Sequence, residues 1–319
     1  MNFRVLHGSG LRLSAVGLGG VELGGGDASN GEPSLSEAIA VVGAALEAGV
    51  NWLDTAEAYH AHRNERFIGE MLRHTGDELL LSTKLAPAPC GGGYRPDEVH
   101  AGCRASLARL GREQIDIYLL HLPDETGVPL EDTWDAMGQL VEQGLVRAIG
   151  LSNYGLDAVE RCHAQRPVDI VQDGLSLIDH LDNRPVFERC HQLGIGVAVY
   201  EPLGSGTLSG QSIDQVRQAW ADWAEFGFYK RLLAGENGDA SAAFVDALRP
   251  IAAHLETTVP QLAIAWVLHQ KGVTAAIAGS RNPSHVRQNA EAADLTISET
   301  ILAQLEAVIA LGPTVAPGP

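Results

Sequence analysis

Short apolar runs alternate with amphipathic stretches along nearly the whole of this chain, from about residue 15 to residue 293. Alternation of this kind predicts a parallel sheet whose strands are connected by crossover helices. Eight such units predict a closed (β/α)8 TIM barrel rather than an open doubly wound sheet. The strands are expected at residues 15–19, 51–54, 79–84, 115–121, 146–151, 169–172, 196–200 and 274–278.

The stretches between the expected strands have helical spacing. From Glu37 to Glu47, apolar and small side chains recur at intervals of three and four residues, as on one face of an amphipathic helix. The predicted inner face consists of Ile39, Val42, Gly43 and Leu46. No composition shift marks a domain boundary, so residues 1–319 are expected to form a single domain.

Two regions lie outside the alternation. Residues 3–14 contain a glycine-rich turn and are expected to form a β-hairpin that plugs the bottom of the barrel. Residues 205–240 form a long insert after the seventh strand, and its aromatic residues could line the substrate pocket as a wall or lid, or simply pack on the barrel. Residues 312–319 are expected to be a flexible tail. The aromatic residues of the insert are Trp220, Trp223, Phe226, Phe228 and Tyr229.

Charge and cysteine content narrow the class of protein. The chain has 22 basic and 40 acidic residues and a net charge of −18, which argues against binding to nucleic acid or to an anionic membrane. Neither a signal segment nor an apolar run of the ~18 residues that span a bilayer is visible. The four cysteines are scattered, which is typical of a reduced cytoplasmic protein. A monomer is the default expectation.

Four proton-handling side chains fall at the ends of three successive expected strands. Asp54 ends one strand and Tyr59 follows it, Lys84 ends the next, and His121 ends the third. In a barrel these ends converge on one face, where the active sites of such folds lie. A lysine ammonium beside a phenol favours the phenolate and lowers the pKa of the tyrosine, while an aspartate keeps the lysine charged. A histidine can orient a carbonyl group, so the set suits general acid–base catalysis on a carbonyl or alcohol.

Each of these residues also has a structural interpretation when taken alone. An aspartate at a strand end is often a helix N-cap, and a lysine there is usually exposed to solvent. A single histidine is more often a hydrogen-bonded structural residue, and a single tyrosine more often packs in the core. The functional interpretation therefore depends on the four residues occurring together.

The chain resembles the aldo-keto reductase family over nearly its whole length. The resemblance lies in Leu53-Asp54-Thr55-Ala56 with Tyr59, Ser82-Thr83-Lys84, Ile115-Asp116-Ile117-Tyr118 with His121, the run 146–153, and the segments 194–197 and 200–203. It implies that Asp54, Tyr59, Lys84 and His121 form a catalytic tetrad, with Tyr59 as proton donor. It also implies a nicotinamide cofactor bound on the barrel without a separate dinucleotide-binding domain, and a small carbonyl or sugar-type substrate.

The same resemblance suggests where the cofactor lies. Ser152, Asn153 and Gln172 would hydrogen-bond the carboxamide, and Tyr200 would stack on the nicotinamide ring. The segment 203–208, with Leu203, Gly204 and Gly206, would approach the pyrophosphate through backbone N–H groups. Gly19 and Gly20 would line the groove, and the adenosine end would be held by Gly279, Ser280, Arg281, Gln288 and Asn289.

Arg281 bears on the choice of cofactor. A guanidinium can bind a 2′-phosphate in a charge-assisted, bidentate manner. Few other cations are available in so acidic a chain, so NADPH is favoured over NADH.

Several positions differ from the usual family pattern. His60 and His62 stand where glycines are common, Asp173-Gly174-Leu175-Ser176 replaces a stretch that normally has a Glu-Tyr pair at 174–175, and Val21 replaces a bulky aromatic. In the adenosine segment, His285 replaces a usual Gln or Arg, and Gln288 replaces Glu. With His121, the two histidines could form a zinc site, but their short loop spacing argues for solvent-facing or substrate-contacting roles and for no metal.

Two other functions are compatible with parts of the pattern. A slow-turnover subunit that senses NADPH and regulates a partner would keep the fold and the cofactor site. An aldolase-like barrel would use Lys84 as a Schiff-base nucleophile, although a neighbouring Asp54 would keep that lysine protonated. The sequence assigns neither a particular substrate nor the physiological direction of the reaction.

Overall fold

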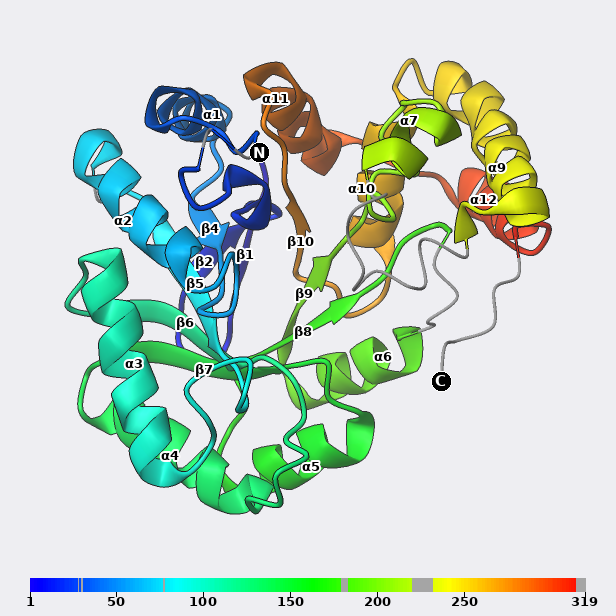
Figure 1. Cartoon of the computed structure of the whole chain (residues 1–319). Coiled ribbons are helices and arrows are strands. Elements are labelled where there is room, and N and C mark those ends of the chain that lie inside the picture. Colours follow the sequence, from blue (N-terminus) through cyan, green and yellow to red (C-terminus); the bar gives the residue numbers. More distant parts are fainter. Residues whose placement is uncertain (28, 30, 77, 179–182, 220–231, 314–319) are drawn as a thin grey trace.

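Eight parallel strands close into a barrel, and the predicted fold class is confirmed (Figure 1). The computed structural model describes residues 1–319 except 28, 30, 77, 179–182, 220–231 and 314–319. Around the barrel the strands follow the order β10-β3-β4-β5-β6-β7-β8-β9, and each lies within two residues of its expected bounds. They are β3 (Val16–Gly19), β4 (Trp52–Asp54), β5 (Leu80–Leu85), β6 (Ile115–Leu120), β7 (Val146–Ser152), β8 (Ile170–Gly174), β9 (Gly196–Tyr200) and β10 (Ala275–Ala278).

Helices surround the barrel on its outer side (Figure 1). Those between the strands are α1 (Leu35–Glu47), α2 (Arg63–Thr75), α3 (Pro96–Leu110), α4 (Leu130–Glu142), α5 (Leu156–Gln165), α6 (Arg184–Leu193), α7 (Ile213–Ala219), α9 (Gly235–His254) and α10 (Val259–His269). After β10 come α11 (Pro283–Glu291) and α12 (Glu299–Ile309), and two short 3-10 helices are η1 (Val21–Leu23) and η3 (Ala292–Asp294). Helix α1 begins with a capping box, in which Ser34 and Glu37 each accept a hydrogen bond from the other's backbone N–H.

The inner face of α1 differs from the predicted one. The buried residues include Ala38, Val41, Val42 and Ala45, whereas the predicted Ile39, Gly43 and Leu46 are only half-buried. Ile39 and Leu46 pack at the edge of the cluster that contains Leu18 of β3 and Leu53 of β4. Small alanines at the centre of the face allow the helix to approach the barrel, so the largest aliphatic side chains do not mark the axis of contact.

The N-terminal hairpin closes one end of the barrel, as expected. Strands β1 (Phe3–Val5) and β2 (Arg12–Ser14) pair in antiparallel register, and Leu6, Leu11 and Leu13 are almost completely buried. Their side chains pack against residues of six barrel strands: Trp52, Ile117, Leu119, Ala148, Ile170, Ala198, Ala275 and Ile277. Because β2 leads directly into β3, this hydrophobic plug lies at the N-terminal ends of the strands and leaves the other end for the site.

The segment after β9 is only partly the long insert that was expected. Residues 213–219 form α7, and α9 begins at Gly235. The aromatic residues expected to form a wall or lid lie outside the described residues, as do residues 314–319 of the expected tail. In the described ranges no single helix is long and apolar enough to cross a membrane, although α9 and α10 together, bent by 84°, meet the length and composition test.

The plug predicts a large loss of stability when one of its leucines is shortened. Leu13→Ala removes a fully buried side chain and should lower the free energy of unfolding by about 2–5 kcal/mol. Val5→Ala, on the exposed side of the same hairpin, is the matched control and should cost less than about 1 kcal/mol. Urea unfolding of both variants checks this, and similar losses in the two would contradict the plug.

Candidate active site

A buried ion pair joins the ends of β4 and β5. Lys84 Nζ lies 2.6 Å from Asp54 Oδ2 and donates a second hydrogen bond of 2.8 Å to the carbonyl oxygen of Thr55. The other carboxylate oxygen of Asp54 accepts hydrogen bonds of 2.8 Å from Ser82 Oγ and from Gln172 Nε2. Both charged side chains are almost fully buried, with exposed fractions of 1% for Lys84 and 5% for Asp54. A pair buried this deeply is stable only because its remaining polar atoms also have partners.

Tyr59 reaches the same ammonium group from the loop after β4. Lys84 Nζ lies 3.3 Å from the Tyr59 hydroxyl oxygen and 5.0 Å from the centre of its ring. Burial acts to lower the pKa of Lys84, but Asp54 and Tyr59 outweigh it and raise that pKa overall. The lysine is therefore a permanent cation at neutral pH.

The pKa of Tyr59 moves in the opposite direction from the one predicted. Burial raises it, and although Lys84 lowers it as expected, the burial effect and the nearby Asp54 and Glu22 carboxyls prevail. The sequence shows the lysine but not the depth at which the phenol is buried. Tyr59 is thus a protonated phenol that can donate a hydrogen ion, in line with a role as an acid.

His121 completes the group as a neutral imidazole. It follows β6, and its backbone N–H donates a 2.8 Å hydrogen bond to the carbonyl oxygen of Leu85. Its ring stands edge-on to the Tyr59 ring, with centroids 5.7 Å apart. Burial, followed by the charge of Lys84, lowers the pKa of His121 to about 3. Its Nδ1 is buried without a hydrogen-bond partner among the described residues, so the ring can bind another polar group.

The polar residues of the second half of the barrel reach the same end. Asn153 Nδ2 donates a 3.0 Å hydrogen bond to the carbonyl oxygen of His121, and the Tyr200 hydroxyl donates a 2.6 Å bond to Asn153 Oδ1. Ser152 and Gln172 are buried on β7 and β8, and the Gln172 amide nitrogen already binds Asp54. A side chain at Gly174 would come within 3.1 Å of the Tyr200 ring, so glycine there makes room for that tyrosine.

The glycines at the expected cofactor groove stand where backbones approach closely. A Cβ on Gly19 would lie 3.1 Å from the backbone of Gly279, and one on Gly20 would lie 2.7 Å from the carbonyl oxygen of Asp54. These glycines allow the ends of β3, β4 and β10 to come together.

The loop after β9 differs from the expectation that its backbone donors face a phosphate. In this structure the N–H groups of Gly204 and Gly206 bind the carbonyl oxygens of Glu201 and Leu203 within the loop. Thr207 Oγ1, by contrast, is buried without a partner among the described residues and is suited to bind a polar ligand atom. A nicotinamide dinucleotide fits the residues present through such buried polar atoms, including Nδ1 of His121.

The expected adenosine segment forms the turn into α11. Ser280 Oγ accepts a hydrogen bond of 3.1 Å from the backbone N–H of Asn282. Arg281 is exposed, and its Nε and Nη1 donate to the carbonyl oxygens of Glu22 (3.0 Å) and Gly31 (2.9 Å). The guanidinium thus holds the loop between β3 and α1. The Gln288 side chain is exposed, and Asn289 is buried on α11.

Glu22 is a functional candidate that the sequence did not suggest. Its Oε2 is buried without a hydrogen-bond partner among the described residues, and it would lie 1.9 Å from a Cβ on Gly279 and 3.3 Å from one on Gly19. Burial, together with the nearby Glu201 and Asp54, raises the pKa of this carboxyl to about 7. An acidic residue directly after a glycine-rich strand end is the signal that could have pointed to it.

The two unusual histidines after Tyr59 have different surroundings, and contact of either with a substrate stays a prediction. The His60 side chain is only 12% exposed, and its ring contacts Glu32 and the carbonyl oxygen of Val21, so it does not face solvent. His62 Nδ1 is buried without a partner within the described part of the chain. Over the same residues, no three His, Cys, Asp or Glu side chains lie together as a metal site requires.

Glu22 should make stability depend on pH. Its carboxyl binds a proton more tightly in the folded protein, at a pKa of about 7, than at its ordinary value of 4.5. The folded state therefore loses stability as pH rises from 4.5 to about 7, because the buried carboxyl must ionise. Glu22→Gln should stabilise the protein by about 1–3 kcal/mol more at pH 8 than at pH 5. Urea unfolding at both pH values measures this, and an equal change at the two would refute it.

Comparison with known proteins identifies the family. A sequence profile of the Aldo/keto reductase family matches residues 15–310. A probable aldo-keto reductase 1 from Glycine max is 32% identical over 282 residues, which cover 86% of this chain and 80% of that protein. The solved structure of a glycerol dehydrogenase from Gluconobacter oxydans has the same fold, with a TM-score of 0.82, 22% identity, and coverage of 96% of this chain and 95% of that one. This chain belongs to the aldo/keto reductase family, whose members are nicotinamide-dependent oxidoreductases of carbonyl and alcohol groups.

Proposed function

We propose that the protein reduces an aldehyde or ketone to the alcohol with NADPH, or catalyses the reverse oxidation, and that Tyr59 is the proton donor. The observation that carries this proposal is the contact between the Tyr59 hydroxyl and Lys84 Nζ, at 3.3 Å, within a buried and fully hydrogen-bonded group. When bound, the cofactor supplies a hydride from nicotinamide C4 to the carbonyl carbon. The residues of the tetrad transfer the proton and stabilise the negative charge that develops on the carbonyl oxygen.

The tetrad divides the proton chemistry among its members. As negative charge develops on the carbonyl oxygen, Tyr59 gives its proton to that oxygen, and the Lys84 ammonium stabilises the phenolate that remains. Asp54 holds the ammonium in place and keeps it charged. A neutral His121 donates one N–H to the substrate oxygen and so orients the carbonyl group. Because its pKa is low, His121 stays neutral and does not compete with Tyr59 as the acid.

The cofactor proposal follows the family resemblance and the grouping of polar residues. Ser152, Asn153 and Gln172 would bind the carboxamide, and Tyr200 would lie along the nicotinamide ring. Asn153 is well placed for this because its amide is held between the His121 carbonyl oxygen and the Tyr200 hydroxyl. The remaining contacts would come from Gly19, Gly20, Leu203, Gly204, Gly206, Gly279, Ser280, Arg281, Gln288 and Asn289.

A Schiff-base role for Lys84 is disfavoured by the same geometry. A nucleophilic lysine must lose its proton at neutral pH, whereas Asp54 and Tyr59 raise the pKa of this one. The slow-turnover regulatory subunit stays a prediction, as do a cytoplasmic location and a monomeric state. Steady-state turnover above about 1 per second on a simple aldehyde, which is ordinary for an enzyme, would exclude the regulatory alternative.

Replacing the proposed proton donor should separate chemistry from binding. Tyr59→Phe removes only the hydroxyl, so we expect kcat for aldehyde reduction to fall by at least about a hundredfold. Binding of NADPH, followed by quenching of tryptophan fluorescence, should change little. A Tyr59→Phe enzyme that keeps full turnover would overturn the assignment of the proton donor.

Arg281 should distinguish the two cofactors. Two of its N–H groups bind carbonyl oxygens, but Nη2 has no hydrogen-bond partner among the described residues and the side chain is exposed. Arg281→Ala should raise the KM for NADPH at least about tenfold more than the KM for NADH, because only NADPH has the 2′-phosphate. Steady-state kinetics with both cofactors measures the difference. Equal increases would mean that the guanidinium acts only on the loop.

A further inference from the structure

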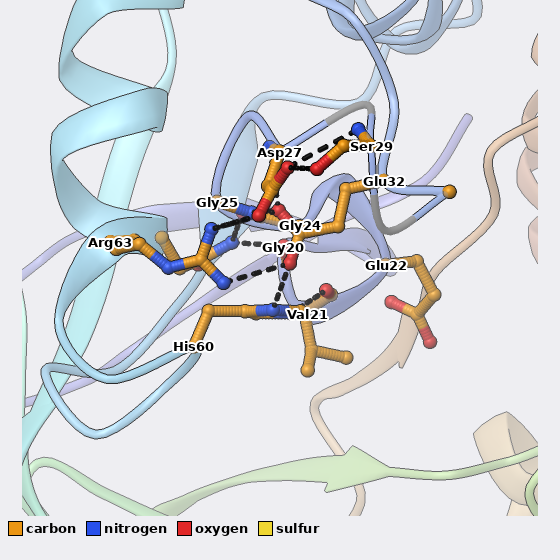
Figure 2. A network of polar contacts seen from close by, with 12 residues as sticks. Gly20, Val21, Glu22, Gly24, Gly25, Asp27, Ser29, Glu32, His60 and Arg63 are labelled. Carbon is orange, nitrogen blue, oxygen red and sulfur yellow. Dashed lines mark hydrogen bonds and ion pairs between the residues drawn. The ribbon is translucent and has the colours of Figure 1, made fainter. Parts of the chain in front are cut away.

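His60 holds two hydrogen-bond acceptors at once. Its Nδ1 lies 3.0 Å from Glu32 Oε1, and its Nε2 lies 3.0 Å from the carbonyl oxygen of Val21 (Figure 2). A backbone carbonyl can only accept a hydrogen bond. Glu32 is ionised at neutral pH, because two backbone N–H groups and Arg63 outweigh the effect of its burial and lower its pKa to about 2. Both ring nitrogens must therefore donate, which only the imidazolium form can do.

The charged groups around His60 are compatible with this positive charge. Glu32 also accepts hydrogen bonds from the backbone N–H groups of Gly25 and Asp27, each 2.8 Å long, and pairs with Arg63 Nη2 at 3.0 Å. Asp27 Oδ2 lies 3.9 Å from Arg63. Two carboxylates thus face two cations, and the Glu22 side chain lies apart from this network in the same view (Figure 2).

The contact restrains an unfavourable stretch of backbone. His60, Ala61 and His62 all have left-handed conformations, with φ of 50°, 52° and 67°. Three successive residues with a Cβ rarely adopt this conformation, and each costs about 1 kcal/mol or more. The turn directly follows Tyr59, so whatever stabilises it also fixes the proposed proton donor.

The acceptor of the second hydrogen bond belongs to the loop between β3 and α1. The carbonyl oxygen of Val21 is bound by His60, and that of the next residue, Glu22, is bound by Arg281 at 3.0 Å. Asn64, at the start of α2, donates a further hydrogen bond of 2.9 Å to the carbonyl oxygen of Gly20. This one loop joins the Tyr59 turn to the expected cofactor groove at Gly20 and to the expected adenosine segment.

We propose that His60 is a positioning residue: as an imidazolium it fixes the Tyr59 turn against the β3–α1 loop, and carbonyl reduction depends on that protonated state. This inference rests on the proposed function. If the ring lost a proton, one nitrogen would become an acceptor facing another acceptor, so the contact would break and the turn would be released.

The test compares the two histidines of the turn. His60→Asn keeps a residue type that tolerates the left-handed conformation but removes the charge and one of the two contacts. His62→Asn makes the same change two residues away, where Nδ1 of the histidine has no hydrogen-bond partner among the described residues. For each enzyme, kcat and KM are measured with NADPH and a simple aldehyde from pH 5.5 to pH 9.

We expect His60→Asn to lower kcat about tenfold at pH 6. His62→Asn should keep the wild-type profile. A His60→Asn profile that matches wild type, or a loss equal in both variants, would overturn the proposal. If wild type shows no NADPH-linked reduction of any carbonyl compound, the proposed function fails instead.

A second measurement does not depend on activity or on the folding of a variant. The 15N shifts of histidine in the wild-type protein report the protonation of each ring nitrogen, and the His60 resonances are assigned by through-bond correlation. Both nitrogens of His60 should be protonated at pH 6. A neutral His60 ring at that pH would refute the imidazolium contact whatever the kinetics show.

Discussion

The buried pair of Asp54 and Lys84 is the interaction on which the site depends. Moving two charges from water into the protein costs several kcal/mol per ion, even after the protein relaxes. The attraction within the pair and the hydrogen bonds around it must offset a free energy of about this size. Here Ser82, Gln172 and the Thr55 carbonyl oxygen supply the remaining hydrogen bonds. These groups come from β4, β5 and β8, so the ion pair can exist only when the barrel has closed. A fixed cation of this kind would stabilise the phenolate that Tyr59, as the proposed proton donor, leaves behind.

The barrel separates the requirements of stability from those of chemistry. At the N-terminal ends of the strands, the leucines of the hairpin fill the interior and exclude water. At the other end, the strands finish in charged and polar side chains that are held by one another rather than by hydrophobic packing. Gly19 at the end of β3, and Gly20 and Gly279 directly after β3 and β10, permit a close approach at this end, where a larger residue would push the strands apart.

Much of the fold and the site could be predicted because both follow from local patterns. Alternating apolar runs determine the strands, and Asp54, Lys84 and His121 lie at or next to the strand ends where the sequence predicts them. The predicted direction of the Tyr59 pKa shift was wrong, because the burial that raises this pKa depends on segments far away in the chain. The predicted inner face of α1 was wrong, because small side chains lie closest to the barrel there.

The contacts between loops could not be predicted from the sequence, because they too join segments that are far apart in the chain. Arg281 meets Glu22 and Gly31 across some 250 residues of chain, and nothing in the local pattern near any of them indicates the pairing. His60 was recognised as unusual, but its partners Glu32 and Val21 become visible only in three dimensions. The pKa of the Glu22 carboxyl is raised to about 7 by burial and by Glu201 and Asp54, which lie far from it in the chain.

The most direct test of the tetrad is a single-turnover experiment with NADPH that carries deuterium at the transferred position of C4. The reduction of a simple aldehyde is followed in H2O and in D2O, so that product release does not hide the chemical step. If Tyr59 protonates the oxygen as hydride reaches the carbon, both substitutions slow the same step. Reduction that is insensitive to the cofactor deuterium, or to the solvent, would contradict proton donation coupled to hydride transfer at this site.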